Sequence, residues 1–91
     1  MRYNLRPTTQ FRKDLKRMQK RGVDISLLKD VLKKLAAGEP LPEKNMDHML
    51  FGDYKGHREC HINSDWLLIY RIVEKQSVVS LISTGSHSDL F

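Results

Sequence analysis

The chain has 91 residues, 40% of them hydrophobic and 30% charged, with a formal net charge of +5 and one cysteine. This length favours one domain, and a single cysteine excludes an internal disulfide. The longest apolar run, from Trp66 to Tyr70, is far shorter than the ~20 residues of a membrane helix, and the opening MRYNLRPTTQ lacks the apolar segment of a secretory signal. We therefore expect one domain over residues 1–91, located in the cytoplasm and not in a membrane.

Two amphipathic elements are expected first. The alternation of polar and apolar residues over 2–6 is typical of a short strand. Phe11, Leu15 and Met18 then lie on one side of a helix that Gly22 ends. The other side of this helix is strongly basic.

A second helix is expected immediately afterwards. Asp24 can cap it, its apolar stripe runs from Ile25 to Leu35, and Gly38 ends it. Because only a short turn around Gly22 separates the two helices, they should form an antiparallel hairpin.

Three strands are expected in the second half, after a polar loop over 43–56. The period of 3.6 ends there: 57–62 and 77–83 are expected as strands, and the nearly continuous apolar run 66–73 as a strand buried on much of both faces, with turn-forming residues between the three segments. The spacing after Ser86 is that of a cap for one helical turn. The order β-α-α-β-β-β predicts an α+β fold, in which the helical hairpin covers one face of a mainly antiparallel four-stranded sheet and leaves the other face open.

Charge is distributed unevenly along the chain. Residues 1–47 hold 12 Lys and Arg against 6 Asp and Glu, whereas residues 48–91 hold 4 against 5 and contain all the histidines. A basic surface favours a polyanionic partner, nucleic acid above all. A solvated lysine-rich helix accounts for the same excess, and charge alone leaves both interpretations open.

The expected strand at 57–62 carries an unusual number of titratable groups. Because side chains alternate along a strand, His57, Glu59 and His61 share the open face, whereas Cys60 faces the helices as a buried, inert thiol. A metal site, an acid–base site and a solvated strand compete as interpretations. The Cα atoms of the two histidines would lie ~13 Å apart, too far for one metal ion with bonds of ~2 Å. We therefore expect no metal and favour acid–base chemistry.

Two segments resemble a known family. They are DHMLFGDYKGHRECHINSDWLLIY at residues 47–70, with Phe51 outside the match, and TGSHSDLF at residues 84–91. Asp-His, Lys-Gly-x-Arg, His-x-x-x-Asp and Gly-x-His-x-x-Leu-Phe follow one another in this order, which is a specific combination. On these motifs the chain resembles, over nearly its whole length, the YafQ branch of the RelE/ParE superfamily of bacterial type II toxins, whose fold matches the expected order of elements.

This resemblance implies a ribosome-dependent mRNA endonuclease, or mRNA interferase. Such a toxin cuts mRNA in the A site of the 70S ribosome, stops translation and is neutralised by a cognate antitoxin protein encoded beside it. The family uses no metal and no small-molecule cofactor. Its functional residues fall here on His48, His61, Asp65, His87 and the C-terminal aromatic Phe91.

Two positions depart from the family pattern. Glu59 stands where a relative has aspartate, which keeps the charge on a longer side chain. Ser83 stands where that relative has an arginine late in the last strand. The loss of this cation makes Lys55 and Arg58 more important as contacts to phosphate.

The implied chemistry needs few groups. A base takes the proton of a 2′-OH, this oxygen attacks the adjacent phosphorus, an acid protonates the departing 5′-oxygen, and a cation stabilises the phosphoryl oxygens. Histidine suits both proton roles near neutral pH. We expect His48, His61 and His87 to transfer protons, with His87 as the preferred acid. Asp65 would orient a histidine or take a proton, and Glu59 completes the expected catalytic set.

RNA contacts are expected outside this set. The last aromatic residue can stack on a nucleobase, as aromatic side chains do with single-stranded RNA. The basic face of the first helix can contact ribosomal RNA or an acidic antitoxin segment. The expected RNA-binding residues are Lys55, Arg58, Phe91, Lys13, Lys16 and Arg17.

Two other functions remain as alternatives. Related ParE-like toxins are non-catalytic binders of DNA gyrase, but a pure binding protein has no need for clustered groups that titrate near neutrality. A free-standing metal-dependent nuclease is the third possibility.

Overall fold

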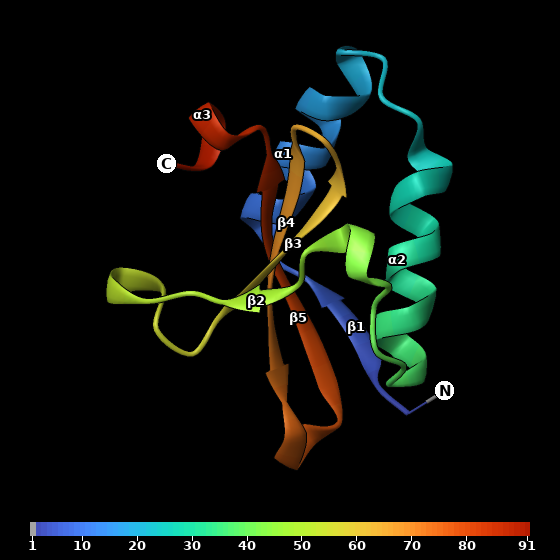
Figure 1. Ribbon diagram of the computed structural model, residues 1–91, viewed down its shortest axis with the longest axis vertical. Helices are drawn as coiled ribbons and strands as arrows, with labels where there is room; N and C mark the ends of the chain where they lie inside the picture. The colour runs from blue at the N-terminus through green and yellow to red at the C-terminus, as the bar shows by residue number, and fades with distance from the viewer. Residues whose placement is uncertain (1) are drawn as a thin grey trace.

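The computed structural model describes residues 2–91, which form one mixed sheet flanked by helices (Figure 1). The strand order is β1-β5-β4-β3-β2, with β1 parallel to β5 and all other neighbours antiparallel. None of the helices in this range is long and apolar enough to cross a bilayer. The elements are β1 (Asn4–Pro7), α1 (Thr9–Lys20), α2 (Ile25–Ala37), η1 (Glu43–Asn45), β2 (His48–Met49), η2 (Gly52–Tyr54), β3 (Arg58–Asn63), β4 (Trp66–Val73), η3 (Glu74–Gln76), β5 (Val78–Gly85) and α3 (His87–Leu90).

The predicted α+β fold with a helical hairpin is confirmed, but the sheet has a fifth strand. The expectation of four strands is wrong because β2 is only two residues long and lies inside a polar loop. Its backbone pairs His48 with Glu59 and Met49 with Arg58. A strand this short forms only by pairing with β3, and two residues are too few to show a periodic pattern in the sequence.

The helices begin and end at the residues expected to cap them. The Thr8 hydroxyl accepts a hydrogen bond from the Phe11 N–H, and the Asp24 carboxylate accepts one from the Ser26 N–H. Gly38 ends α2 in the left-handed region, with φ of 72°. The two helices run in opposite directions on the same face of the sheet (Figure 1).

The core lies between this helical hairpin and the sheet. Alternate residues of β4 point into it, as do the apolar stripes of both helices. Cys60 and Trp66 are buried there, as the sequence predicts. The central members are Phe11, Met18, Leu28, Val31, Leu35, Cys60, Trp66, Leu68 and Tyr70.

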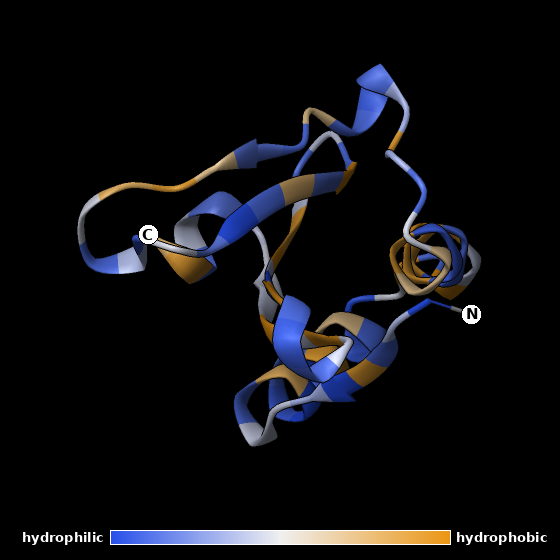
Figure 2. Cartoon of the chain, turned by 90° about the horizontal axis from the view of Figure 1, so that it is seen from below, coloured by the Kyte–Doolittle hydropathy of each residue, from blue (hydrophilic) through white to orange (hydrophobic). Residues whose placement is uncertain are grey.

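The face of the sheet away from the hairpin is not bare. Leu67 and Ile69 point to this face, yet both are buried to 1% exposure or less. The segment around η2 and the C-terminal α3 both lie on this side of the sheet (Figure 1 and Figure 2). The rings of Tyr54 and Phe91 meet there edge to face, with centroids 5.7 Å apart. This side of the sheet, expected to be open, is therefore partly covered by two short segments that meet through these rings, and we refer to it as the cleft.

Helix α1 also completes the outer edge of β5. Strand β1 pairs with β5 only as far as Leu81. Beyond that point Thr8 donates its hydroxyl to the Ile82 carbonyl at 2.8 Å, and the Thr84 N–H donates to Asp14 Oδ2 at 3.1 Å. Side chains of the helix thus satisfy backbone groups that a neighbouring strand would otherwise bond, which explains why the Asp14 carboxylate is buried.

Candidate active site

Two histidines share one carboxylate in the cleft. The pairing of β2 with β3 places His48 opposite Glu59, and His61 follows two residues later on the same face of β3. Glu59 Oε1 lies 3.4 Å from His48 Nε2 and 3.9 Å from His61 Nε2. A single oxygen atom can therefore stabilise a positive charge on either imidazole. We call these three residues the His–Glu–His cluster.

Glu59 is far more buried than the competing interpretation, a solvated charge on the strand, would require. Its exposure is 3%, and its second oxygen, Oε2, has no hydrogen-bond partner within residues 2–91. An unsatisfied buried acceptor costs about 1–3 kcal/mol. Such a cost is typical of a group that is retained for function.

His48 is held in a defined orientation. Its Nδ1 lies 2.7 Å from the Met46 carbonyl oxygen, which can only accept, so Nδ1 carries a proton and donates it. The ring is thereby fixed with Nε2 toward Glu59. The side chain is about half exposed, which leaves it accessible to a substrate.

The residue before His48 anchors strand β2 from the other side. Arg58 Nη2 donates to Asp47 Oδ2 at 2.9 Å, and the Tyr70 hydroxyl donates to Asp47 Oδ1. The hydrogen bond to Asp47 raises the pKa of Arg58, while burial and then the same carboxylate raise the pKa of Tyr70. Arg58 is engaged with Asp47 through this ion pair. Its role as a phosphate contact stays a prediction.

His61 is fixed through its backbone. The buried Asn45 side chain donates a hydrogen bond from Nδ2 to the His61 carbonyl at 2.7 Å. The neighbouring Cys60 points into the core, and burial raises the pKa of its thiol to about 12. The thiol is therefore protonated at neutral pH and inert, as expected.

The C-terminal helix α3 presents a second group of candidate residues. Ser86 and Asp89 form a capping box, and the His87 N–H donates to Asp65 Oδ1 at 3.2 Å. The rings of His87 and Phe91 lie 5.3 Å apart. Asp65 thus positions the start of α3 and, with it, His87.

Sheet register relates the two groups. Gly85, just before α3, pairs with Leu67, which in turn pairs with His61. Two inter-strand spacings amount to about 10 Å. Helix α3 therefore begins at the end of the row that contains His61, and it lies beside the same cleft.

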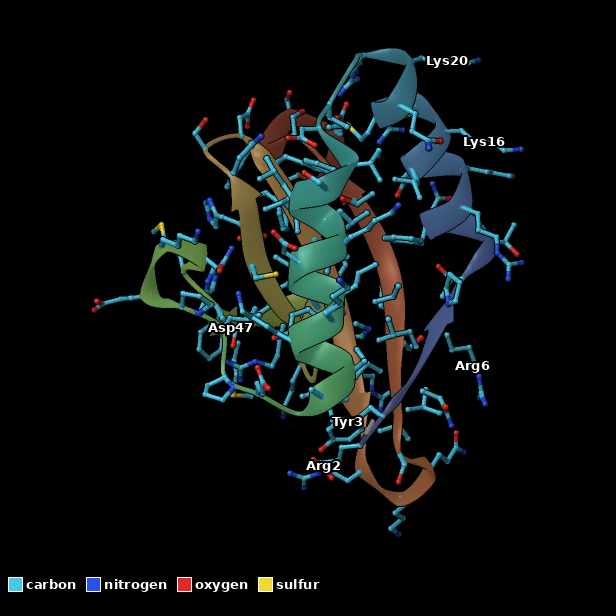
Figure 3. The ribbon with its side chains drawn as sticks, turned by 90° about the vertical axis from the view of Figure 1, so that its right-hand side faces the viewer. Arg2, Tyr3, Arg6, Lys16, Lys20 and Asp47 are labelled. Atoms are coloured by element: carbon cyan, nitrogen blue, oxygen red, sulfur yellow. The ribbon has the colours of Figure 1, made fainter. Side chains whose placement is uncertain are left out.

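The expected RNA-binding cations lie in three different settings. Lys13 and Lys16 are exposed on α1, and Lys16 and Lys20 extend into solvent (Figure 3). Arg17 instead turns toward the sheet, where Nη2 donates to the Thr84 carbonyl at 3.3 Å. Lys55 is exposed in the loop before β3. Lys13, Lys16 and Lys55 are therefore available to a polyanion, whereas Arg17 is held in place.

The comparison with protein families assigns the chain. The model described as "Bacterial toxin of type II toxin-antitoxin system, YafQ" matches residues 3–91. The chain belongs to the YafQ family of type II toxins. The mRNA interferase toxin YafQ of Escherichia coli strain K12 is 40% identical over 83 residues, which cover 90% of this chain and 88% of that protein. The resemblance seen in the sequence motifs is thus confirmed.

Solved structures of YafQ and related toxins share the fold. The metal-bound toxin from Helicobacter pylori superposes with a TM-score of 0.92 at 42% identity, covering 98% of this chain and 99% of that chain. A chain of the Escherichia coli DinJ–YafQ complex gives 0.89 at 36% identity and covers 98% of both chains. Within residues 2–91, no group of three or more His, Cys, Asp and Glu residues is placed to hold a metal ion.

Several residues of this YafQ-family site escaped the sequence analysis. Tyr54 contacts Phe91, but the sequence places it in a loop without periodicity and so gives it no partner. Asp47 was noted only as part of the Asp-His motif, although it anchors β2. Arg21 and Asp89 were not connected at all, because 68 residues separate them. Only Tyr54 gives a local signal of a site, because it is an aromatic residue in a polar loop.

Helix α3 is clamped to α1 by an ion pair, which gives a prediction. Arg21 Nη2 donates to Asp89 Oδ1 at 3.0 Å, and this bond holds the pKa of Asp89 well below its ordinary value. The clamp is therefore present at neutral and mildly acidic pH and is lost only as the pH falls through that lowered pKa. We expect Asp89→Ala to displace His87 and to slow RNA cleavage by up to about 10²-fold.

A control variant separates this effect from a general loss of stability. Asp24→Ala also removes a capping carboxylate, at a cost of about 0.5–2 kcal/mol, but it lies on α2 away from the cleft. Cleavage rates and urea unfolding of both variants test the clamp. Equal rates for Asp89→Ala and Asp24→Ala would show that α3 needs no clamp.

Proposed function

We propose that this chain is a ribosome-dependent endoribonuclease that cuts mRNA, inhibits translation in the cytoplasm and is neutralised by a cognate antitoxin. One observation carries the proposal: the Nε2 atoms of His48 and His61 lie 3.4 and 3.9 Å from the same oxygen of Glu59. The name of the Escherichia coli relative, an mRNA interferase, and the existence of a DinJ–YafQ complex support it.

The cluster supplies the groups for a metal-independent transesterification. One imidazole accepts the proton of the 2′-OH, O2′ forms a bond to phosphorus, and the bond from phosphorus to O5′ breaks. A protonated imidazole gives its proton to the departing O5′. The products are a 2′,3′-cyclic phosphate and a 5′-hydroxyl, and each positioned acid or base contributes about 10²–10⁴-fold to the rate.

Each residue has a distinct part in this mechanism. Glu59 stabilises whichever imidazolium forms in the cluster, through Oε1. His87 is the preferred acid, and Asp65 positions it through the backbone of α3. Phe91, exposed beside His87, stacks on a nucleobase.

The exposed cations hold the polyanionic partners. Lys55 lies in the loop that leads into β3 and contacts a phosphate of the mRNA. Lys13 and Lys16 form a basic surface on α1, which meets ribosomal RNA or an acidic segment of the antitoxin. Both partners are polyanionic, so they compete for this surface.

The proposal is tested by mapping cleavage on a defined mRNA. Purified protein is added to the same mRNA either free in solution or on translating ribosomes, with and without the product of the neighbouring gene. We expect cleavage on ribosomes only, and its suppression by the antitoxin. Intact mRNA on ribosomes, together with inhibition of supercoiling by DNA gyrase, would instead establish the non-catalytic ParE-like function.

A further inference from the structure

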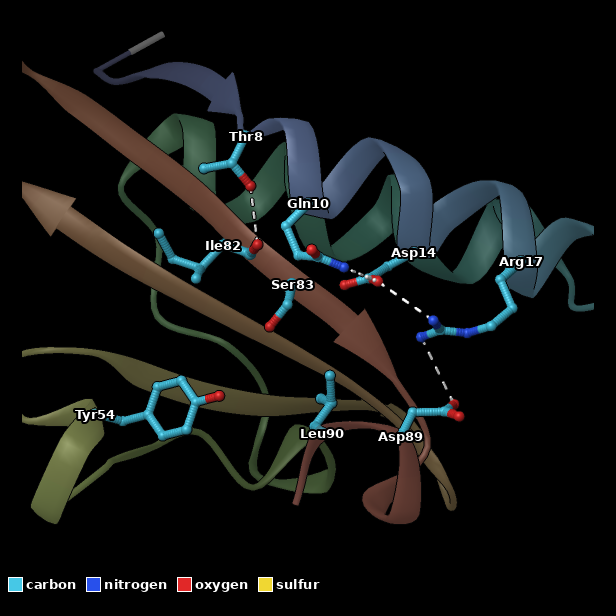
Figure 4. Close-up of a pocket in the computed structure, with 9 residues that line it drawn as sticks. All are labelled: Thr8, Gln10, Asp14, Arg17, Tyr54, Ile82, Ser83, Asp89 and Leu90. Carbon is cyan, nitrogen blue, oxygen red and sulfur yellow. Dashed lines mark hydrogen bonds and ion pairs between the residues drawn. The ribbon is translucent and has the colours of Figure 1, made fainter.

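A polar cavity of about 410 Å³ lies between α1, β5 and the C-terminal segment (Figure 4). Its walls include Gln10 from α1, Ser83 from β5, Tyr54 from η2 and Leu90 from α3. We propose that this cavity is a subsite for a nucleobase of the mRNA beside the scissile phosphate. The inference rests on the proposed function, which it deepens by identifying how the toxin selects its cleavage sites.

Sheet register places the cavity next to the His–Glu–His cluster. Ser83 pairs with Ile69, and Ile69 pairs with Glu59, so these residues form one row across the cleft. The row spans two inter-strand spacings, about 10 Å. On its other side, the cavity wall Tyr54 contacts Phe91, which contacts His87. A nucleotide adjacent to the cleaved bond can therefore reach the cavity.

The charged groups of the cavity wall, together with Arg21, which pairs with Asp89 from outside the wall, neutralise one another. Arg17 lies 3.4 Å from the Asp14 carboxylate and 3.9 Å from the Asp89 carboxylate. Asp89 is in turn held by Arg21. Two carboxylates and two guanidinium groups leave no net charge for a phosphate, so the cavity suits an uncharged ligand.

The remaining wall groups suit a planar ligand with hydrogen-bond donors and acceptors. In the part of the chain that the structure describes, the hydroxyls of Ser83 and Tyr54 form no hydrogen bond. Gln10 donates a hydrogen bond from Nε2 to Asp14 at 2.8 Å, and the amide oxygen of Gln10 stays free to accept one. Figure 4 shows the Tyr54 hydroxyl directed into the cavity. An aromatic wall with unpaired polar groups is the usual surface for a nucleobase.

Three variants test the subsite without removing any residue of the His–Glu–His cluster. Ser83→Ala and Tyr54→Phe each remove one hydroxyl, and Ser83→Leu places a bulky apolar side chain in the cavity. Ser80→Leu is the matched control, because Ser80 lies on the same face of β5 but outside the cavity. Each protein is assayed on ribosomes with mRNAs that differ only in the base on either side of the cleaved bond.

We expect wild type and Ser80→Leu to prefer one base at one of these positions. The hydroxyl variants should lower that preference by about 2- to 10-fold, the value of one hydrogen bond, and Ser83→Leu should abolish it. Unchanged preference in all three variants, or a uniform slowing on every mRNA with the preference retained, would overturn the subsite while leaving the proposed function intact.

A binding measurement is independent of cleavage. In wild type, ribonucleoside 5′-monophosphates should shift the NMR signals of the backbone amides at positions 54 and 83. The same amides should not shift in Ser83→Leu, and inorganic phosphate should shift them in neither protein. Equal shifts with phosphate alone would overturn the subsite. If wild type cuts no mRNA, the proposed function fails, and this titration still decides whether the cavity binds a base.

Discussion

Replacing His61 with alanine is expected to slow cleavage of mRNA on ribosomes by about 10²- to 10⁴-fold. The reason is geometric: His61 Nε2 lies 3.9 Å from the Glu59 oxygen that also faces His48. Removing this imidazole deletes one of the three proposed proton-transfer groups and leaves the fold intact, since the side chain makes no hydrogen bond to the core within residues 2–91. Single-turnover cleavage on stalled ribosomes measures the effect.

His57→Ala is the matched control. His57 also lies near the start of β3, but its ring contacts Tyr54 and not the cluster. We expect this variant to cut mRNA at close to the wild-type rate. If His61→Ala cuts as fast as His57→Ala, the assignment of His61 is wrong.

Glu59→Gln is expected to change activity and stability in opposite directions. Without the carboxylate, neither imidazolium is stabilised, so cleavage should slow by about 10²-fold or more. The same substitution removes a buried charge whose Oε2 has no partner in residues 2–91. We therefore expect the free energy of unfolding to rise by about 1 kcal/mol.

Urea unfolding and single-turnover cleavage of one preparation measure both changes. Asp53→Asn, which removes an exposed charge near the cleft, is the control and should leave both quantities nearly unchanged. An active Glu59→Gln would remove Glu59 from the mechanism. A less stable Glu59→Gln would mean that the buried carboxylate supports the fold rather than straining it.

Elements with local signals were predicted well from the sequence. Strand β4 occupies Trp66–Val73, as its apolar run indicates, and α2 lies between Asp24 and Gly38, which cap it. The weak capping signal at Ser86 also proved correct, because the side chains of this short helix satisfy its own first turn. In each case the information is contained within a few neighbouring residues.

Features that depend on distant contacts were not predictable. Strand β2 forms only because β3 offers a partner, and the burial of Glu59 depends on what lies above the sheet. Alternation along β3 did place His61 and Glu59 on one face. The partners of Arg58 and Arg17, however, come from other elements, so their engagement could not be read from charge alone.

The central claim is that imidazoles of this cleft drive attack by the 2′-OH of the mRNA. It is tested most directly on ribosomes carrying an mRNA in which the nucleotide before the mapped cut is replaced by its 2′-deoxy form. We expect no cleavage of this mRNA at that position, and a 2′,3′-cyclic phosphate on the upstream fragment of the unmodified mRNA. Cleavage of the deoxy-substituted mRNA, or a 3′-hydroxyl on the upstream fragment, would contradict it.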